Sequence, residues 1–289
     1  MYRKITLPAG IGDGIWVLMH LVNSGEKFDF FIPDSKPQRG KQLYDLLPQV
    51  ANSCSYKPRL TYKSIANANV QNRKRNWRDI TERDFVLSAN SHLEAGKRIE
   101  DFLPDLAVSY RIKYNTASED KIRALQLLPN GPKYIGIYTS AYANARHDHY
   151  NGYGPTEWIE LVNLLHKGNK DFVFVVIGAP YDGDLSGMVA TEMELRGVPF
   201  VNTVGQPLPV VIEMLKRMFY FIGFPSGLSI LNETLGKDGT MFYGHKIKGI
   251  INTWADPERI KNHNIKECFF CPPQQIFDWL KNTYKIFDR

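Results

Sequence analysis

The sequence predicts an α/β protein built from two Rossmann-like, doubly wound domains that face each other across a cleft. Three observations support this fold class. The 289-residue chain is long enough for two domains of about 140 residues each. Two runs of alternating strand and helix patterns, which predict parallel sheets, flank a Pro/Gly-rich hinge at 127–132. Hydrophobic residues make up 43% and charged residues 23%, an ordinary composition that excludes a disordered, collagenous or coiled-coil chain.

The first run of elements begins near the N-terminus. Its apolar patterns predict, in chain order, a strand at 5–7, a helix at 15–22, and strands at 28–32 and 85–87. Pro8 ends the first strand, and a glycine-rich turn at 10–14 leads into the helix. Strand, glycine turn, helix and strand form a βαβ unit. We therefore expect an N-terminal domain at 1–130 that opens with a parallel sheet.

The second run, after the hinge, shows the same alternation. Its patterns predict strands at 134–138, 172–177, 200–203, 220–224 and 241–243, and helices at 156–166, 209–218, 228–235 and 275–284. The strand at 172–177 is almost purely apolar, as expected for one that is buried on both faces. We therefore expect a C-terminal domain at 131–289, with its last helix packing back on the N-terminal domain.

The cysteine content indicates a reducing compartment, because three cysteines cannot form a closed disulfide framework. Cys268 and Cys271 form a C-x-x-C pair, but no second pair completes a four-ligand zinc site, so packed thiols are favoured. The start of the chain does not match a secretion signal, because Pro8 interrupts its first apolar stretch. No apolar run reaches the roughly 18 residues that span a membrane. A cytoplasmic protein is predicted, in the host cytoplasm if it is viral.

The turn at 8–14 carries the first candidate catalytic residue, Asp13. Its glycines and the following helix start could bind a phosphate, but Ile15 breaks the dinucleotide pattern G-x-G-x-x-G and no Walker lysine follows. A carboxylate at this place is either a helix N-cap or a general base that the helix dipole keeps ionised. Both interpretations stay open on the residues alone.

Five motifs follow one another along most of the chain. They are Gly10-Ile11-Gly12-Asp13, Trp158 with Leu161 and Leu165, Val175-Val176-Ile177-Gly178 with Asp182, Asn202-Thr203-Val204-Gly205-Gln206, and Ile222-Gly223-Phe224-Pro225-Ser226-Gly227-Leu228. In this order and spacing they resemble the lipopolysaccharide heptosyltransferase family of glycosyltransferases. The resemblance implies the GT-B fold of two Rossmann-like domains. It also implies that Asp13 deprotonates the acceptor hydroxyl.

The presumed donor loop departs from the family at two positions. Pro225 stands where the family has an aspartate before Ser-Gly, and Ile230 stands where it has a histidine. Both groups help to hold the nucleotide sugar in relatives, so the resemblance does not extend to ADP-heptose as the donor. Ser226 and Gly227 at a helix start remain as a diphosphate cradle. Glu233 on the same helix is either a ribose ligand or part of a solvated helix face.

The loop at 138–154 is long and rich in polar side chains, which is typical of functional loops. Arg146 or His147 could neutralise the charge of a leaving diphosphate. Asp148 between two histidines also suggests a metal ion, but no further histidine cluster completes a site. We therefore expect no metal, and no cofactor besides the nucleoside-diphosphate sugar as co-substrate. The candidate donor-binding residues are Thr139, Ser140, Arg146, His147, Gly178, Gly205, Ser226, Gly227 and Glu233.

Positive charge is concentrated in the N-terminal half. The net charge is +6, and no acidic residue lies between Asp45 and Asp79, where basic, aromatic and amide side chains alternate. Such a segment suits phosphates and unstacked bases, although a solvated loop is the alternative. The candidate acceptor-binding residues are Gly12, Asn90, Arg73, Lys74, Arg75 and Trp77. His92 is a second candidate catalytic base, whereas Glu94 fits a capping box that begins at Ser91.

Together these features favour an inverting glycosyltransferase that moves a sugar from a nucleoside-diphosphate sugar to a hydroxyl of a polyanionic acceptor. The favoured acceptor is DNA with hydroxymethylated bases, as modified by bacteriophage glycosyltransferases. It is favoured because the basic segment is long and because the donor loop differs from the heptosyltransferase pattern. One alternative is a transferase acting on lipopolysaccharide core or another phosphorylated glycan. Another, from a different class, is a non-catalytic nucleic-acid-binding module on a transferase fold. The sequence specifies neither the sugar, nor the nucleotide, nor the oligomeric state.

Overall fold

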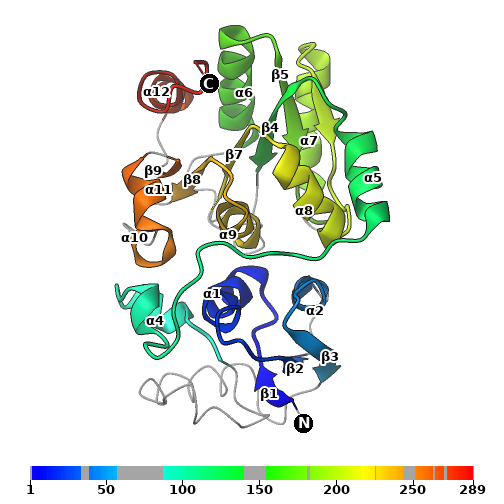
Figure 1. The fold of residues 1–289 in the computed structure, drawn as a ribbon. Helices are drawn as coiled ribbons and strands as arrows, with labels where there is room; N and C mark the ends of the chain where they lie inside the picture. The colour runs from blue at the N-terminus through cyan, green and yellow to red at the C-terminus, as the bar shows by residue number, and fades with distance from the viewer. Residues whose placement is uncertain are drawn as a thin grey trace. The chain divides into compact units, whose positions relative to one another are not determined.

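The computed structural model describes residues 2–33, 39–56, 87–139, 154–180, 183–224, 226–243, 251–262, 264–269 and 272–288. The chain forms two compact units (Figure 1). The first unit holds Met1–Thr116 and Gly249–Pro257, and the second holds Ala117–Lys248 and Glu258–Arg289. Among the described residues, no helix combines the length and the apolar character that a membrane crossing requires.

The first unit is built around a parallel sheet. Its elements are β1 (Arg3–Thr6), α1 (Ile11–Leu21), β2 (Phe28–Pro33), α2 (Arg39–Tyr44), β3 (Val50–Tyr56), α4 (Asn90–Glu94), the 3-10 helix η2 (Ile99–Asp101) and α10 (Ile251–Trp254). The strands lie in the order β1-β2-β3. Ile5 of β1 aligns with Phe30 of β2, and both are buried. The backbone N–H of Leu87 donates to the carbonyl of Thr6 at 3.0 Å, so the chain comes back to β1 before α4 begins.

Helix α10 joins the first unit from a distant part of the sequence. Trp254 is buried, and its ring centroid lies 6.2 Å from that of Trp16 on α1. The Arg98 guanidinium binds the Glu100 carboxylate through Nε at 3.0 Å and Nη2 at 2.6 Å. Its Nη1 donates to the carbonyl of Asn252, which is 154 positions away in the sequence. Two remote segments therefore share one core.

The second unit is a six-stranded parallel sheet flanked by helices (Figure 1). Its elements are α5 (Ser118–Leu127), β4 (Lys133–Tyr138), α6 (Pro155–Gly168), β5 (Phe172–Val176), α7 (Gly183–Leu195), β6 (Phe200–Asn202), α8 (Leu208–Arg217), β7 (Tyr220–Gly223), α9 (Gly227–Thr234), β8 (Gly239–Tyr243), α11 (Pro257–Lys261), β9 (Ile265–Phe269), α12 (Pro273–Asp278) and the π-helical turn η6 (Trp279–Thr283). The strand order β6-β5-β4-β7-β8-β9 is the Rossmann order 3-2-1-4-5-6 when counted from β4. The predicted doubly wound α/β class is confirmed.

Helix α6 illustrates why the elements form where they do. Pro155 stands in the first turn, where a helix needs no backbone N–H. The Glu157 carboxylate accepts a hydrogen bond from the N–H of Gly154 at 2.7 Å and so closes the N-terminus. Trp158 and Leu161 are 0% exposed, which gives the helix the apolar stripe that faces the sheet.

The two units differ from the expected division at residue 130. Helix α5, which precedes the expected hinge, packs against α8 in the second unit. Arg217 at the end of α8 donates to the carbonyl of Leu128 at 2.7 Å and to the side chain of Asn130 at 2.5 Å, which fixes the connection after α5. The segment that returns to the first unit is 249–257, whereas α12 packs against α6 in the second unit.

Candidate active site

The predicted glycine turn links β1 to α1 in the first unit. Helix α1 begins at Ile11, and Gly10 precedes it in an extended conformation without any side-chain cap. The hydroxyl of Tyr44, at the end of α2, donates to the carbonyl of Pro8 at 2.6 Å. Because the turn follows β1, it lies at the carboxyl edge of the sheet, where parallel α/β sheets bind ligands. This placement puts Asp13, in the first turn of α1, at that edge.

The carboxylate of Asp13 has a perturbed acidity. Burial, reinforced by repulsion from the Glu94 carboxylate, raises the pKa of Asp13 from 3.8 to about 6. Within the described part of the chain, no hydrogen bond or ion pair engages this side chain. A capping carboxylate would have the opposite shift, because helix N–H groups stabilise its charged form. A carboxylate with this pKa is mostly ionised at pH 7 and is more basic than that of an ordinary aspartate.

Helix α4 carries three of the residues singled out in the sequence. His92 is 9% exposed, and its Nε2 lies 2.7 Å from the carbonyl of Arg98. Because a carbonyl only accepts, Nε2 must carry a proton and donate it. The side-chain amide of Asn90 donates to the Glu94 carboxylate at 3.0 Å. This hydrogen bond orients the ring and makes Nδ1 the nitrogen that accepts a proton, so the role of His92 as a second base stays a prediction.

A second buried histidine, His20 of α1, was not identified from the sequence. Its Nε2 lies 2.9 Å from the carbonyl of Ile99, and its Nδ1 lies 3.2 Å from the carbonyl of Leu106. Burial lowers the pKa of His20 below its ordinary value. The rings of His20 and His92 both pack against Phe102, at centroid distances of 5.9 and 5.7 Å. The sequence does contain a signal for this residue, because His20 is a single polar residue on the apolar face of the helix predicted at 15–22.

In the second unit, the strand order reverses between β4 and β7, and Rossmann sheets bind ligands at this switch point. Thr139 follows β4, and its buried hydroxyl lies 2.9 Å from that of Ser186 on α7. The carbonyl of Gly178, after β5, accepts from the N–H of Gly205, after β6, at 3.0 Å. Gly205 has a φ of +86°, which glycine adopts without steric cost. Three predicted donor residues thus lie beyond the carboxyl ends of one sheet.

Ser226 and Gly227 form the start of α9, directly after the loop that follows β7. Ser226 occupies the N-cap position in an extended conformation, but its hydroxyl caps nothing. The hydroxyl oxygen is buried and has no hydrogen-bond partner among the described residues. This hydroxyl and the first N–H groups of α9 could donate to a phosphate. The other donor candidates, Ser140, Arg146 and His147, lie outside the described residues.

Glu233 has a different role from the ribose contact considered above. It is 1% exposed, and its two carboxylate oxygens lie 3.2 and 3.0 Å from Nε of Arg259. Nη2 of Arg259 also donates to the carbonyl of Lys237 at 2.6 Å. The carboxylate is therefore part of a buried ion pair that joins α9 to α11. Its seclusion from solvent removes Glu233 from the candidate donor ligands.

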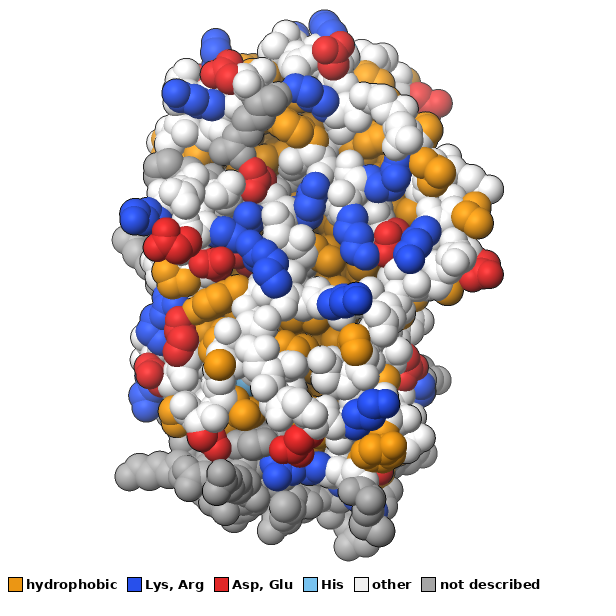
Figure 2. Space-filling model, in the orientation of Figure 1, with side chains coloured by type: hydrophobic (Ala, Val, Ile, Leu, Met, Phe, Trp, Pro, Cys, Tyr) orange, Lys and Arg blue, Asp and Glu red, His pale blue; other side chains and the backbone are white. Residues whose placement is uncertain are grey.

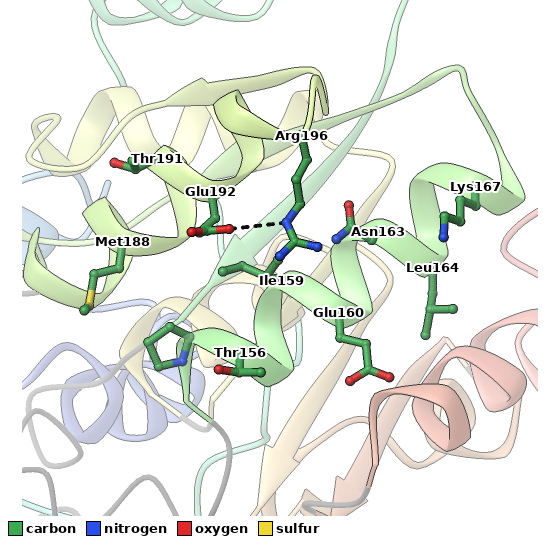
Figure 3. A pocket seen from close by; sticks show the side chains of 11 residues that line it. Thr156, Ile159, Glu160, Asn163, Leu164, Lys167, Met188, Thr191, Glu192 and Arg196 are labelled. Atoms are coloured by element: carbon green, nitrogen blue, oxygen red, sulfur yellow. Dashed lines mark hydrogen bonds and ion pairs between the residues drawn. The ribbon is translucent and has the colours of Figure 1, made fainter.

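A groove of about 830 Å³ lies between the outer faces of α6 and α7 (Figure 3). Its wall includes the apolar side chains of Ile159 and Met188 and an ion pair in which Nε of Arg196 lies 3.3 Å from Oε2 of Glu192. None of the predicted donor residues lines it. The groove is formed by helix faces, whereas the candidate donor site is formed by loops that follow strands.

The expected basic acceptor segment, with Arg73, Lys74, Arg75 and Trp77, lies outside the described residues. Figure 2 shows lysine and arginine side chains gathered across the middle of the view, with aspartate and glutamate side chains mostly to either side of them.

The described residues also include no group of three or more His, Cys, Asp or Glu side chains that could hold a metal ion. Cys54 of β3 is an exposed free thiol. Cys271 lies outside the described residues, and Cys268 belongs to β9, at the edge of the second sheet.

The fold of the chain is similar to those of solved glycosyltransferase structures. ADP-heptose lipopolysaccharide heptosyltransferase II from E. coli matches over 99% of this chain and 99% of its own, with a TM-score of 0.64 and 12% identity. A glycosyl transferase family 9 protein from Veillonella parvula matches over 98% and 90%, with a TM-score of 0.62 and 14% identity. The E. coli heptosyltransferase WaaC with ADP matches over 96% and 99%, with a TM-score of 0.57 and 14% identity.

At these identities the likeness shows the fold, and it confirms the GT-B class that the motifs implied. No protein-family model matches the sequence, and no curated protein sequence matches it either.

Proposed function

We propose that the chain is an inverting glycosyltransferase that uses a nucleoside-diphosphate sugar. The observation that carries this proposal is the Asp13 carboxylate at the carboxyl edge of the first sheet, with its pKa raised to about 6 by burial and by Glu94. Perturbed acidity at a ligand-binding edge is typical of a general base. The GT-B fold, which the chain shares with solved transferase structures over nearly its full length, supports this reaction class.

In the proposed reaction, the ionised Asp13 carboxylate takes the proton from an acceptor hydroxyl. The acceptor oxygen forms a bond to the anomeric carbon of the sugar, and the bond from that carbon to the diphosphate oxygen breaks. The electron pair of the broken bond leaves with the nucleoside diphosphate, and the configuration at the anomeric carbon inverts. A base with a pKa near 6 suits this step, because it is available at neutral pH and still binds a proton appreciably.

The second unit is proposed to hold the donor. Ser226 and Gly227 at the N-terminus of α9 would bind the diphosphate, where helix N–H groups stabilise negative charge. The uncapped, buried hydroxyl of Ser226 supports this assignment, because a bound phosphate would supply the missing acceptor. Thr139, Gly178 and Gly205 would shape the same end of the sheet. Arg146 and His147 remain proposed neighbours of the leaving group.

For the acceptor, we propose a phosphorylated glycan of the lipopolysaccharide-core type. Two of the similar structures are heptosyltransferases, one of them described as acting on lipopolysaccharide. The net charge of +6, together with the run of basic residues at 57–78, suits a phosphorylated acceptor. The DNA acceptor favoured in the sequence analysis, and the bacteriophage enzymes that suggested it, receive no support from the comparisons.

The test is a transfer assay read by mass spectrometry. The protein is incubated with ADP-heptose and with ADP-, UDP- and GDP-hexoses, each combined with deacylated lipopolysaccharide core or with hydroxymethylcytosine DNA. We expect one donor to add a single glycosyl residue to the core oligosaccharide. The Asp13→Asn variant should bind that donor with an unchanged Kd but transfer at least about 100-fold more slowly, because it has no base.

Three outcomes would contradict parts of the proposal. Transfer to DNA in place of the glycan would reverse the choice of acceptor. A wild-type transfer rate in Asp13→Asn would remove Asp13 as the base. Absence of transfer from every donor to every acceptor, with no nucleotide binding, would refute the transferase assignment itself.

A further inference from the structure

We infer that helix α2 positions Asp13 for catalysis, with Tyr44 as the principal positioning residue. The inference rests on the proposed function, because it assigns α2 a role toward the base of that reaction. It comes from three contacts between α2 and the segment at 8–14, which contains Asp13. No local pattern in the sequence singled out this short helix.

The first contact is a hydrogen bond at the start of the segment. Tyr44 is 0% exposed, and its hydroxyl donates to the carbonyl of Pro8 at 2.6 Å. Pro8 is itself buried, and a buried carbonyl needs a donor. The bond therefore fixes the point at which the chain leaves β1 and turns toward α1.

The second contact lies at the other end of the segment. A Cβ atom on Gly14 would stand 2.1 Å from the hydroxyl oxygen of Tyr44 and 2.9 Å from its ring carbon Cζ. Both distances are shorter than any real Cβ contact, so only glycine fits against this ring. One aromatic side chain thus touches residues on both sides of Asp13.

The third contact is made by the beginning of α2. A Cβ atom on Gly40 would lie 2.7 Å from the carbonyl oxygen of Ala9, so the two backbones pack directly on each other. Helix α1 has no side-chain cap at Gly10 to fix its own start. Helix α2 provides the missing support through Pro8, Ala9 and Gly14.

This support matters because Asp13 has no polar partner within the described residues to orient its carboxylate. The direction of the side chain then depends on where the backbone at 8–14 lies. A displacement of a catalytic group by about 1 Å can reduce a rate about 100-fold. A looser turn would also admit water to the carboxylate, and hydration would lower the pKa of Asp13 from about 6 toward 3.8.

The test compares two buried tyrosines whose hydroxyls each donate to the carbonyl of a proline. Tyr44→Phe removes the bond to Pro8, and Tyr134→Phe is the matched control. Tyr134 at the start of β4 is 4% exposed, and its hydroxyl donates to the carbonyl of Pro129 at 2.9 Å. Two readouts are taken: kcat and KM with their pH profiles in the transfer assay, and the titration of the Asp13 carboxyl by carbon-13 NMR on the free protein.

We expect Tyr44→Phe to lower kcat about 10- to 100-fold with an unchanged donor Kd. Its Asp13 titration midpoint should fall below 6, and the acidic limb of the pH–rate profile should move with it. Tyr134→Phe should change neither quantity. Gly14→Ala is a second variant, because its added methyl group meets the same hydroxyl, and its effect should be smaller in a Tyr44→Phe background.

The NMR titration needs no substrate, so it separates this inference from the proposed function. If the wild type transfers no sugar, the proposed function fails, yet a lowered Asp13 midpoint in Tyr44→Phe would still support the positioning role. An unchanged midpoint in Tyr44→Phe would overturn the inference whether or not transfer is seen. Equal changes in Tyr44→Phe and Tyr134→Phe would overturn it as well, because a general loss of stability would then explain both.

Discussion

Replacing Asp13 with asparagine is expected to stabilise the protein while it removes the proposed base. The pKa of Asp13 is about 6 in the folded protein, against an ordinary value of 3.8 that we take for the unfolded chain. Between these pH values the folded state binds more protons than the unfolded state, so the free energy of unfolding falls as the pH rises. A pKa difference of about two units lowers the free energy of unfolding by about 3 kcal/mol above pH 6. This figure is an upper value, because water partly screens the half-buried carboxylate.

The asparagine variant avoids this cost because it carries no charge at any pH. At pH 8 its melting temperature should exceed that of the wild type, by about 2 to 4 °C for each kcal/mol recovered. At pH 4 the gain should shrink to under about 1 kcal/mol, because Asp13 is then mostly protonated in the folded protein. Asp105→Asn, which changes an exposed carboxylate of the same unit, is the control and should shift neither melting point.

Thermal unfolding followed by circular dichroism at the two pH values checks this expectation. A variant that melts below the wild type at pH 8, or that shows the same difference at both pH values, would refute the reasoning. Asp13 would then be an ordinary surface or capping carboxylate, and the observation that supports it as a base would be lost.

Three further substitutions test the remaining assignments. Ser226→Ala should change the free energy of unfolding by less than about 0.5 kcal/mol, because the hydroxyl caps nothing. It should weaken ADP or UDP binding about 10-fold, as measured by calorimetry. An unchanged affinity would remove Ser226 from the donor site. Glu233→Ala should cost about 3 kcal/mol in urea unfolding, because it leaves the Arg259 cation with Asp238, at 3.4 Å, as its carboxylate partner. The folded variant should bind the donor with the wild-type Kd, and a weakened Kd would restore the ribose contact. His20→Ala should cost about 2–4 kcal/mol through lost packing and the lost hydrogen bond of its single ring N–H, because a neutral imidazole donates to only one of the two carbonyls. Because burial lowers the pKa of His20, the unfolded chain binds a proton at this residue before the folded protein does, and the wild type loses stability as the pH falls below 6.5. His20→Ala should lose less stability over the same pH range. An equal loss would contradict a buried, neutral His20.

Much of the core architecture and of the proposed catalytic turn follows from local patterns. The helix predicted at 15–22 is observed at Ile11–Leu21, and the difference has a physical cause. Gly10, Gly12 and Gly14 have low intrinsic helix propensity, so the first turn looked like a loop. Gly14 is nevertheless helical, and the ring of Tyr44 explains why a glycine stands there, because the ring occupies the space that a side chain would need.

Elements without an apolar stripe could not be predicted in this way. Among the residues of α5, only Ala124 is buried, and α7 includes glycines that interrupt its apolar periodicity. The partners of polar groups were equally hidden, because they depend on tertiary structure. Glu233 and Arg259 are 26 positions apart, and the carbonyls that surround His20 are 79 and 86 positions away. No local spacing encodes such pairs, so the burial of Glu233 could not be foreseen.

Helix α10 has a consequence for how the protein is made. The chain is synthesised from its N-terminus, and a unit normally folds as its residues emerge from the ribosome. Residues 1–116 emerge without Trp254, which packs beside Trp16, and without the Asn252 carbonyl that binds Arg98. The first unit can therefore complete its core only after β4 to β8 of the second unit have been synthesised. A nascent chain that stops at Thr116 would present the unfinished surface around Trp16 to chaperones, and the order of completion need not follow the order of synthesis.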